Sequence, residues 1–229
     1  MNTDRAAILG RVNDVSDEVA ERAAVHAALG DPVRLAMVDD LAVSDRSPKE
    51  LSERFDVPAN LLAHHLDVLA GAGLIERFVS DGDRRRRYVR LAREPFERLG
   101  VATGRPVGPM LFVCSHNSAG SQLAAALWRE RTGRPARSAG THPAALVHPG
   151  AVDAARRAGL DLTSARPRRL ESVHRDETVV TVCDRAHEEL TPSADWWHWS
   201  VPDPVEDGRP AAFDTVLADL DTRIQTVCN

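Results

Sequence analysis

A strand pattern that ends in a cysteine and leads into a helix pattern constrains this chain most. Residues 111–114 are apolar and end at Cys114, residues 115–121 are small or polar, and an Ala/Leu-rich run follows to Trp128. The first run predicts a buried strand and the last a helix. A loop that stacks backbone N–H groups at a helix N-terminus favours anions and lowers the pKa of a thiol. We therefore predict a thiolate at Cys114 near neutral pH; the alternative is a buried free cysteine that closes a strand.

Strand and helix patterns continue to alternate beyond this loop. Residues 136–140 and 178–183 have strand patterns, whereas residues 149–158 and 213–227 have helix patterns. The run at 178–183 is apolar throughout, as expected for a parallel sheet covered on both faces. We predict a doubly wound parallel sheet over residues 109–229, with ligands at the carboxyl ends of its strands.

The first half of the chain has a different pattern. Three or four short helices between residues 17 and 71 precede two β runs, at 74–79 and 88–91, around an Asp-Gly turn. This order predicts a winged helix-turn-helix domain over residues 15–99. A linker rich in Gly and Pro follows at 100–108. The predicted fold class is thus α/β with two domains, of which the N-terminal one is α+β.

Four consecutive arginines occupy the predicted hairpin: Arg84, Arg85, Arg86 and Arg87. The net charge of −5 argues against a uniformly basic nucleic-acid binder, so this local positive charge stands out. A solvated turn is one interpretation. Because the run follows a helix-turn-helix pattern, we predict contacts with DNA phosphates.

The first half of the chain resembles the ArsR-type family of small repressors, over roughly residues 18–92. The similarity lies in residues 29–35, residues 64–75 and the arginine-rich wing. The resemblance implies a homodimer on double-stranded operator DNA, with the helix after the turn in the major groove. Its exposed early positions supply the predicted DNA contacts, polar at Asn60 and His64 and apolar at Leu61 and Ala63. The preceding helix lacks Cys and His, so we predict no thiolate or metal sensor site in this domain.

Residues 109–228 resemble the low-molecular-weight tyrosine phosphatases and the related thiol-dependent arsenate reductases. The residues that match the family's motifs are Cys114, Asn117, Ser121 and, late in the chain, Asp203-Pro204. The resemblance implies a nucleophilic Cys114, supporting roles for Asn117 and Ser121, and a general acid at Asp203. An Asp that merely makes a turn before Pro is the alternative for Asp203.

The same resemblance implies an anion or ligand site, and the sequence departs from the family there. The predicted ligand-binding residues are Ser115, His116, Ser118, Ala119, Gly120 and Cys183. Gly120 stands where the family has an arginine that grips the anion with a bidentate fork. Cys183 matches the second redox cysteine of the reductases, but no third follows it closely.

These patterns predict a DNA-binding repressor whose phosphatase-like domain senses an arsenic species, an oxyanion or a phosphorylated ligand. The alternative is a bifunctional repressor with active arsenate reductase or tyrosine phosphatase, in which Arg166, Arg168 or Arg185 replaces the missing arginine. A phospho-residue reader is a third possibility. We expect no cofactor and no metal. Three scattered cysteines and the lack of a membrane-length apolar run or secretory signal predict a cytoplasmic protein without a membrane partner.

Overall fold

The computed structural model describes residues 17–92, 94–99, 108–190 and 192–228. We call residues 17–99 the N-terminal region and residues 108–228 the C-terminal region. Most of the predicted linker, 100–107, lies outside the described residues. Among the helices that the structure describes, none is long and apolar enough to cross a membrane.

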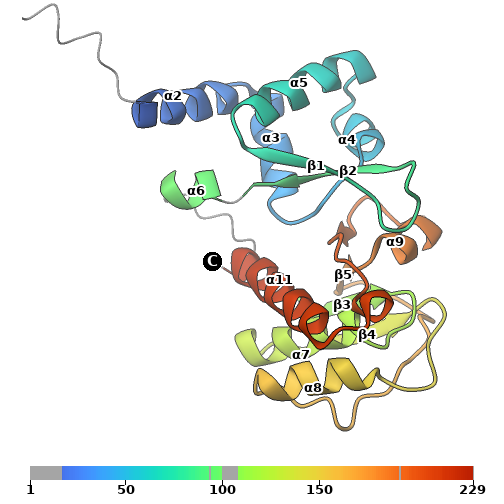
Figure 1. Cartoon of the computed structure of the whole chain (residues 1–229). Helices are drawn as coiled ribbons and strands as arrows, with labels where there is room; N and C mark the ends of the chain where they lie inside the picture. The colour runs from blue at the N-terminus through green and yellow to red at the C-terminus, as the bar shows by residue number, and fades with distance from the viewer. Residues whose placement is uncertain (1–16, 93, 100–107, 191, 229) are drawn as a thin grey trace, which may run out of the picture.

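The N-terminal region has the predicted helices and hairpin (Figure 1). Its elements are α2 (Asp17–Leu29), α3 (Pro32–Leu41), α4 (Pro48–Phe55), α5 (Ala59–Gly71), β1 (Ile75–Val79), β2 (Arg87–Leu91) and α6 (Glu94–Leu99). The start of α4 is set by a capping box, in which Ser47 and Glu50 satisfy each other's backbone N–H groups. β1 and β2 pair antiparallel, so the wing is a hairpin as predicted.

The C-terminal region is a four-stranded parallel sheet with helices packed around it (Figure 1). Its elements are β3 (Met110–Cys114), α7 (Gly120–Thr132), β4 (Ala136–Gly140), α8 (Pro149–Arg157), β5 (Thr178–Thr181), α9 (Asp184–Leu190), β6 (Trp197–His198), α10 (Pro204–Asp207) and α11 (Pro210–Cys228). The strand order is β4-β3-β5-β6, and all three pairings are parallel. The predicted sheet is confirmed. The sequence pattern does not predict α9, because its seven residues are mostly polar and too few to show apolar periodicity.

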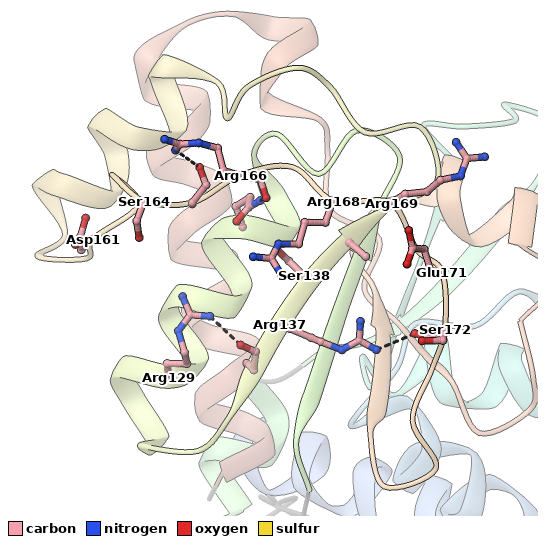
Figure 2. A pocket seen from close by; sticks show the side chains of 14 residues that line it. Arg129, Arg137, Ser138, Asp161, Ser164, Arg166, Arg168, Arg169, Glu171 and Ser172 are labelled. Atoms are coloured by element: carbon pink, nitrogen blue, oxygen red, sulfur yellow. Dashed lines mark hydrogen bonds between the residues drawn. The ribbon is translucent and has the colours of Figure 1, made fainter.

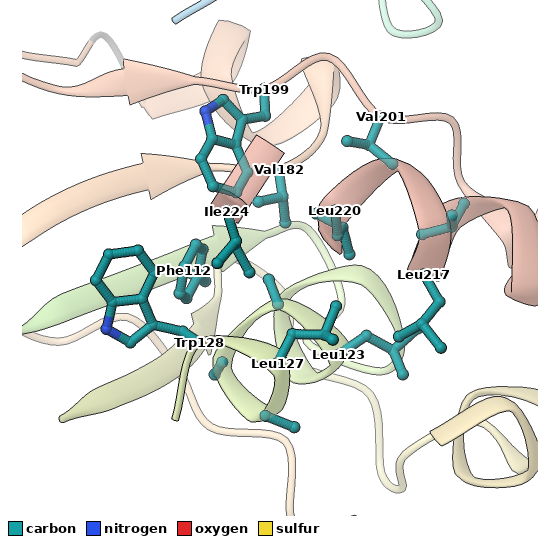
Figure 3. Close-up of a cluster of buried hydrophobic side chains, with 14 of the residues drawn as sticks. Phe112, Leu123, Leu127, Trp128, Val182, Trp199, Val201, Leu217, Leu220 and Ile224 are labelled. Atoms are coloured by element: carbon teal, nitrogen blue, oxygen red, sulfur yellow. The ribbon is translucent and has the colours of Figure 1, made fainter. Parts of the chain in front are cut away.

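One apolar core holds α7 and α11 against the sheet (Figure 3). Trp128 of α7 and Phe112 of β3 are fully buried and lie 6.3 Å apart between ring centroids. Ile224 of α11 is also fully buried in this cluster. The whole first half of α7, from Ser121 to Trp128, is buried, which fixes where the loop before it must end.

Buried polar contacts join the two regions. The chain after α3 runs beside β6, where the backbone N–H of Asp45 donates to the carbonyl of His198 at 2.7 Å. The indole N–H of Trp199 donates to the Val43 carbonyl at 2.9 Å. The buried Asp45 carboxylate meets Arg223 of α11 at 3.2 Å. These groups lie away from water, so the two regions are fixed to one another by specific contacts.

Candidate functional site

The loop between β3 and α7 brings the three predicted catalytic residues of this loop together. The Sγ atom of Cys114 lies 3.0 Å from Ser121 Oγ and accepts the backbone N–H of Asn117 at 3.1 Å. The Asn117 side-chain amide donates to Ser121 Oγ at 2.8 Å. Asn117 has a left-handed backbone with a φ of 50°, a conformation that Asn tolerates better than most residues. Asn117 and Ser121 are fully buried, so this arrangement is rigid.

Further contacts tie the loop to its surroundings. Asn117 Oδ1 accepts the backbone N–H of Arg168 at 2.8 Å and the side-chain amide of Gln122 at 3.0 Å. Gly140, at the end of β4, passes so close that an added Cβ would lie 2.8 Å from the Ser115 carbonyl. Only glycine allows this approach.

The structure contradicts the prediction that Cys114 is a thiolate. Burial raises the pKa of the Cys114 thiol, and hydrogen bonds from Ser121 and Asn117 only partly oppose it. The nearby carboxylate of Asp203 raises this pKa further. The reason is that backbone N–H groups alone do not offset full burial, and Gly120 supplies no cation. The thiol is therefore protonated at neutral pH.

A small cavity lies against Cys114. Its volume is about 20 Å³, roughly the space of one water molecule. It is lined by Cys114, Ser115, His116, Ser118, Ala119, Gly120, Val182, Cys183, Val201, Pro202, Asp203 and Pro204. All the predicted ligand-binding residues thus line one cavity, which has no room for a phosphate as it stands. A Cβ on Gly120 would meet nothing closer than 3.7 Å, so an added Cβ is tolerated at that position.

Cys183 and Asp203 lie at this cavity in different ways. The Sγ atom of Cys183 is 3.5 Å from Ser115 Oγ. Burial and the neighbouring Cys114 raise the pKa of Cys183 to about 12. Asp203 caps α10, since its Oδ1 accepts the backbone N–H of Val205 at 3.0 Å. The turn role weighed for this residue is therefore present, and the side chain also lines the cavity beside Cys114.

The surroundings of the cavity are acidic. A neighbouring cavity of about 30 Å³ shares Ser115, Cys183, Val201 and Asp203 with it and is closed by Asp81, Gly82, Asp184, Arg185 and Glu206. Of the three arginines considered as replacements, only Arg185 lines either cavity, and it pairs with Glu206 at 3.0 Å. Arg166 and Arg168 line a different cavity. Burial, together with Asp184, raises the pKa of Asp81, as expected where carboxylates crowd.

The wing turn closes this second cavity because it is docked on α9. The backbone N–H of Asp81 donates to Asp184 Oδ2 at 2.7 Å, and Ser80 Oγ donates to Glu188 Oε1 at 2.7 Å. A Cβ on Gly82 would lie 2.7 Å from Glu188 Oε2 and 3.1 Å from the Arg185 backbone nitrogen, so a side chain there requires the Glu188 carboxylate to move and the turn to shift slightly. The wing turn and α9 are closely fitted.

Two stacked histidines connect α9 to the helix-turn-helix. The rings of His187 and His198 lie 4.0 Å apart between centroids, and Nδ1 of each is 3.0 Å from Thr181 Oγ1. His187 Nε2 reaches Glu50 of α4 at 3.0 Å, and His198 Nε2 reaches Asp184 at 3.1 Å. Burial lowers the pKa of His187. One hydrogen-bonded chain thus runs from the capping box of α4 to the edge of the cavities.

Hydrogen bonds also shift the pKa of Glu50, the carboxylate at the α4 end of this series of hydrogen bonds. Burial alone would raise the pKa of Glu50, but hydrogen bonds from His187 and Ser47 lower it to about 2. Glu50 is therefore ionised at neutral pH. Its carboxylate contacts both Ser47 in the capping box of α4 and His187 of the C-terminal region.

The predicted DNA contacts are exposed. Asn60, Leu61, Ala63 and His64 all lie on the solvent side of α5, whereas His65 is buried. The four wing arginines are exposed as well. Arg85 pairs with Asp83 at 3.1 Å and Arg86 lies 3.9 Å from Asp83, whereas Arg84 and Arg87 have no ion pair within the described residues. Docking of the wing turn on α9 leaves these side chains accessible.

A helix-turn-helix region with a wing, joined to a parallel sheet that carries a cysteine loop, defines a DNA-binding module combined with a phosphatase-type α/β module. Residues 109–229 match the family model for low molecular weight phosphotyrosine protein phosphatases, and the chain belongs to that family. Residues 29–77 match a helix-turn-helix domain model. Both resemblances, to the ArsR-type helix-turn-helix and to the phosphatases, are confirmed.

Solved structures with similar folds include an arsenate reductase from Archaeoglobus fulgidus, at 28% identity over 51% of this chain and 95% of that chain, with a TM-score of 0.44. A low molecular weight protein tyrosine phosphatase from T. tengcongensis is 20% identical over 52% of this chain and 96% of its own, with a TM-score of 0.47. The tyrosine phosphatase AmsI from Erwinia amylovora is 20% identical over 54% of this chain and 92% of its own, with a TM-score of 0.46. A comparison with curated proteins gives no match.

Proposed function

We propose that this protein is an ArsR-type transcriptional repressor whose phosphatase-like region is a sensor of a small thiol-reactive ligand. The observation that carries the proposal is the position of α9. Cys183 immediately precedes this helix at the cavity, and its two ends hold the wing turn through Asp184 and Glu188. His187 of the same helix contacts Glu50 at the start of the helix-turn-helix. A ligand at Cys183 therefore acts on the element that positions the DNA-binding surface.

Four features favour sensing over turnover. Gly120 removes the arginine that would bind an oxyanion, and burial keeps Cys114 protonated. A working nucleophile of this type requires a thiolate. The cavity of about 20 Å³ is too small for a phosphate ester in this conformation. The acidic groups around it, among them Asp81 and Asp203, oppose an anion.

Among the arsenic species, arsenite best suits the charge of this site and its two thiols, and like phosphate it needs a wider cavity than the one of about 20 Å³. In neutral water it is an uncharged trihydroxide, so the carboxylates do not repel it. Each As–S bond forms as a thiol proton leaves with one hydroxyl group as water, so two protonated thiols are suitable reactants. Cys114 and Cys183 both line the cavity, and both are protonated. Arsenate, phosphate and phosphorylated ligands are the less favoured signals.

We propose that the exposed face of α5, through Asn60 and His64, reads an operator while Leu61 and Ala63 make apolar contacts. The four arginines of the wing, Arg84 to Arg87, contact its phosphates. As in other regulators of this type, a homodimer on a palindromic site is proposed. Ligand binding changes the affinity of the protein for DNA only if its DNA-competent and DNA-incompetent conformations bind the ligand with different affinities.

The test is operator binding by the full chain, titrated with arsenite, arsenate and phosphate. The variants Cys114→Ser and Cys183→Ser are compared with Cys228→Ser, which changes the exposed third cysteine. We expect arsenite to release wild-type protein and the Cys228→Ser control from DNA, and to have no effect on the other two variants. Release by arsenite in all three variants, or no binding to the DNA upstream of its own gene, would refute the proposal.

The alternative is a bifunctional repressor with arsenate reductase or tyrosine phosphatase activity. The intact contacts among Cys114, Asn117 and Ser121 favour it, as does Arg185 beside the cavities. In this case Cys114 is the nucleophile and Asp203 the general acid. Hydrolysis of a phenyl phosphate or reduction of arsenate that is abolished by Cys114→Ser would establish the enzyme. Equal activity in wild type and Cys114→Ser would eliminate it.

A further inference from the structure

A large cavity of the C-terminal region lies away from Cys114 and is lined by arginines (Figure 2). Its volume is about 630 Å³, within the range of sites for small molecules. The segment 161–172 forms one wall, and α7 and the edge strand β4 form the other. Five arginines line it: Arg129, Arg137, Arg166, Arg168 and Arg169. Figure 2 shows the Arg168 side chain above those of Arg129 and Arg137 in this view.

Most of these guanidinium groups have no carboxylate partner. Only Arg137 is neutralised, by Glu177 at 2.6 Å. Arg129 and Arg166 donate to backbone carbonyls, at 2.9 Å and 2.8 Å. Within the described part of the chain, the side chains of Arg168 and Arg169 make no hydrogen bond or ion pair. The cavity therefore concentrates uncompensated positive charge in a chain whose net charge is −5.

Exposed arginines elsewhere in the same region behave differently. Arg131 pairs with Asp221 at 2.7 Å, and Arg157 pairs with Asp214 at 2.6 Å. Arg168 and Arg169 thus differ from these two paired surface arginines. Two carboxylates, Asp161 and Glu171, also line the cavity. Asp161 Oδ1 already accepts hydrogen bonds from the backbone N–H and the hydroxyl group of Thr163. Glu171 is therefore the carboxylate that would oppose a bound anion there.

We propose that this cavity binds an organic polyphosphate, such as a nucleoside triphosphate. The arginines come from both walls, so a ligand with several separated charges satisfies more of them than one phosphate does. Guanidinium groups bind phosphate oxygens with two parallel hydrogen bonds, and Ser138 and Ser164 supply further donors. The cavity is open to solvent, but its volume of about 630 Å³ is that of a site for a small molecule, whereas the backbone of a DNA duplex binds along a longer basic surface.

The site is separate from the cysteine cavity but shares a wall with its loop. The backbone N–H of Arg168 donates to Asn117 Oδ1, and the carbonyl of Arg166 accepts from the Gln122 side chain at 3.1 Å. A ligand that orders the segment 161–172 therefore also stabilises the loop that carries Cys114. The proposal does not depend on what binds at Cys114.

The test is calorimetric titration of the full chain with ATP, with inorganic phosphate and with a short non-operator DNA duplex. The double variant Arg168→Gln/Arg169→Gln is compared with Arg131→Gln/Arg157→Gln, which removes the same charge from paired arginines nearby. We expect ATP to bind the wild type at least tenfold more tightly than phosphate does, the first variant to lose at least tenfold in ATP affinity, and the control to change less than twofold.

Each of three results would overturn the proposal. Equal losses in both double variants would indicate a nonspecific charge effect, and no ATP binding at millimolar concentration would exclude the site. Loss of DNA binding without any ATP binding would show that these arginines contact a nucleic-acid backbone instead. Since Arg168 and Arg169 are exposed, both variants should retain the wild-type circular dichroism spectrum, which confirms that they are folded.

Discussion

The buried carboxylate of Asp45 gives the sharpest test of how the two regions are joined. It accepts the backbone N–H of Ser200 at 2.8 Å and lies 3.2 Å from Arg223 and 3.3 Å from Arg90. Asp45 and Arg223 are 2% and 4% exposed, so both charges have been taken out of water. Burial lowers the pKa of Arg223, but Asp45 and Asp219 together raise it. We predict that Asp45→Asn strongly destabilises the protein.

The expected magnitude follows from what the substitution leaves behind. Asparagine has the same shape, but its amide would face guanidinium donors, and Arg223 would keep only Asp219, at 3.1 Å. Removing one partner of a buried ion pair costs about 3–5 kcal/mol. Because Asp219 remains, we expect the lower end, about 3 kcal/mol. For a chain of this length that corresponds to a fall in melting temperature of about 6–12 °C.

The assay is differential scanning calorimetry at neutral pH, with Asp221→Asn as the matched control. Asp221 makes a short ion pair with Arg131, but at the surface. Exposed pairs contribute little to stability, so the control should melt close to the wild type. If Asp45→Asn melts at the same temperature as Asp221→Asn, the buried contact does not stabilise the joint between the regions, and the reasoning fails.

Three further predictions concern the turn of the wing, the loop after Cys114 and the loss of stability at low pH. Gly82→Ala should lower the free energy of unfolding by about 1 kcal/mol, the low end of overpacking costs, because the Glu188 carboxylate can move but the Arg185 backbone is close. Gly71→Ala, with nothing within 4 Å of the added Cβ, should not lower it, and urea denaturation compares the two variants. Gly120→Arg should make the protein bind phosphate, seen as a phosphate-dependent rise in melting temperature that neither wild type nor Gly120→Ala shows. Because the folded-state pKa of Glu50 is lowered to about 2, its contribution should be complete above its unfolded pKa of about 4.3 and lost as pH falls toward 2. The stability difference between wild type and Glu50→Gln should therefore shrink over that window, and a pH-independent difference would contradict the assignment.

Local sequence signals determined the order of elements and the cysteine loop. Ser47 and Glu50 start a helix by contacts within four residues, and the apolar run before Cys114 predicts its strand without knowledge of the rest. The resemblance to the phosphatases implied that Cys114, Asn117 and Ser121 belong together, and the structure places them within hydrogen-bonding distance. These signals work because caps, turns and periodicity depend on near neighbours.

Only the tertiary structure decided the ionisation of Cys114 and the direction in which each arginine lies. The loop sequence suggested a thiolate, but burial on all sides keeps the thiol protonated. Arg166, Arg168 and Arg185 looked equivalent in the sequence, yet of these three only Arg185 lines the cavity that adjoins the cysteine cavity, whereas Arg166 and Arg168 line a separate one. The contact between His187 and Glu50 joins residues 137 positions apart. Burial and such long-range contacts arise from packing, which no local pattern encodes, and they set the electrostatics of the site.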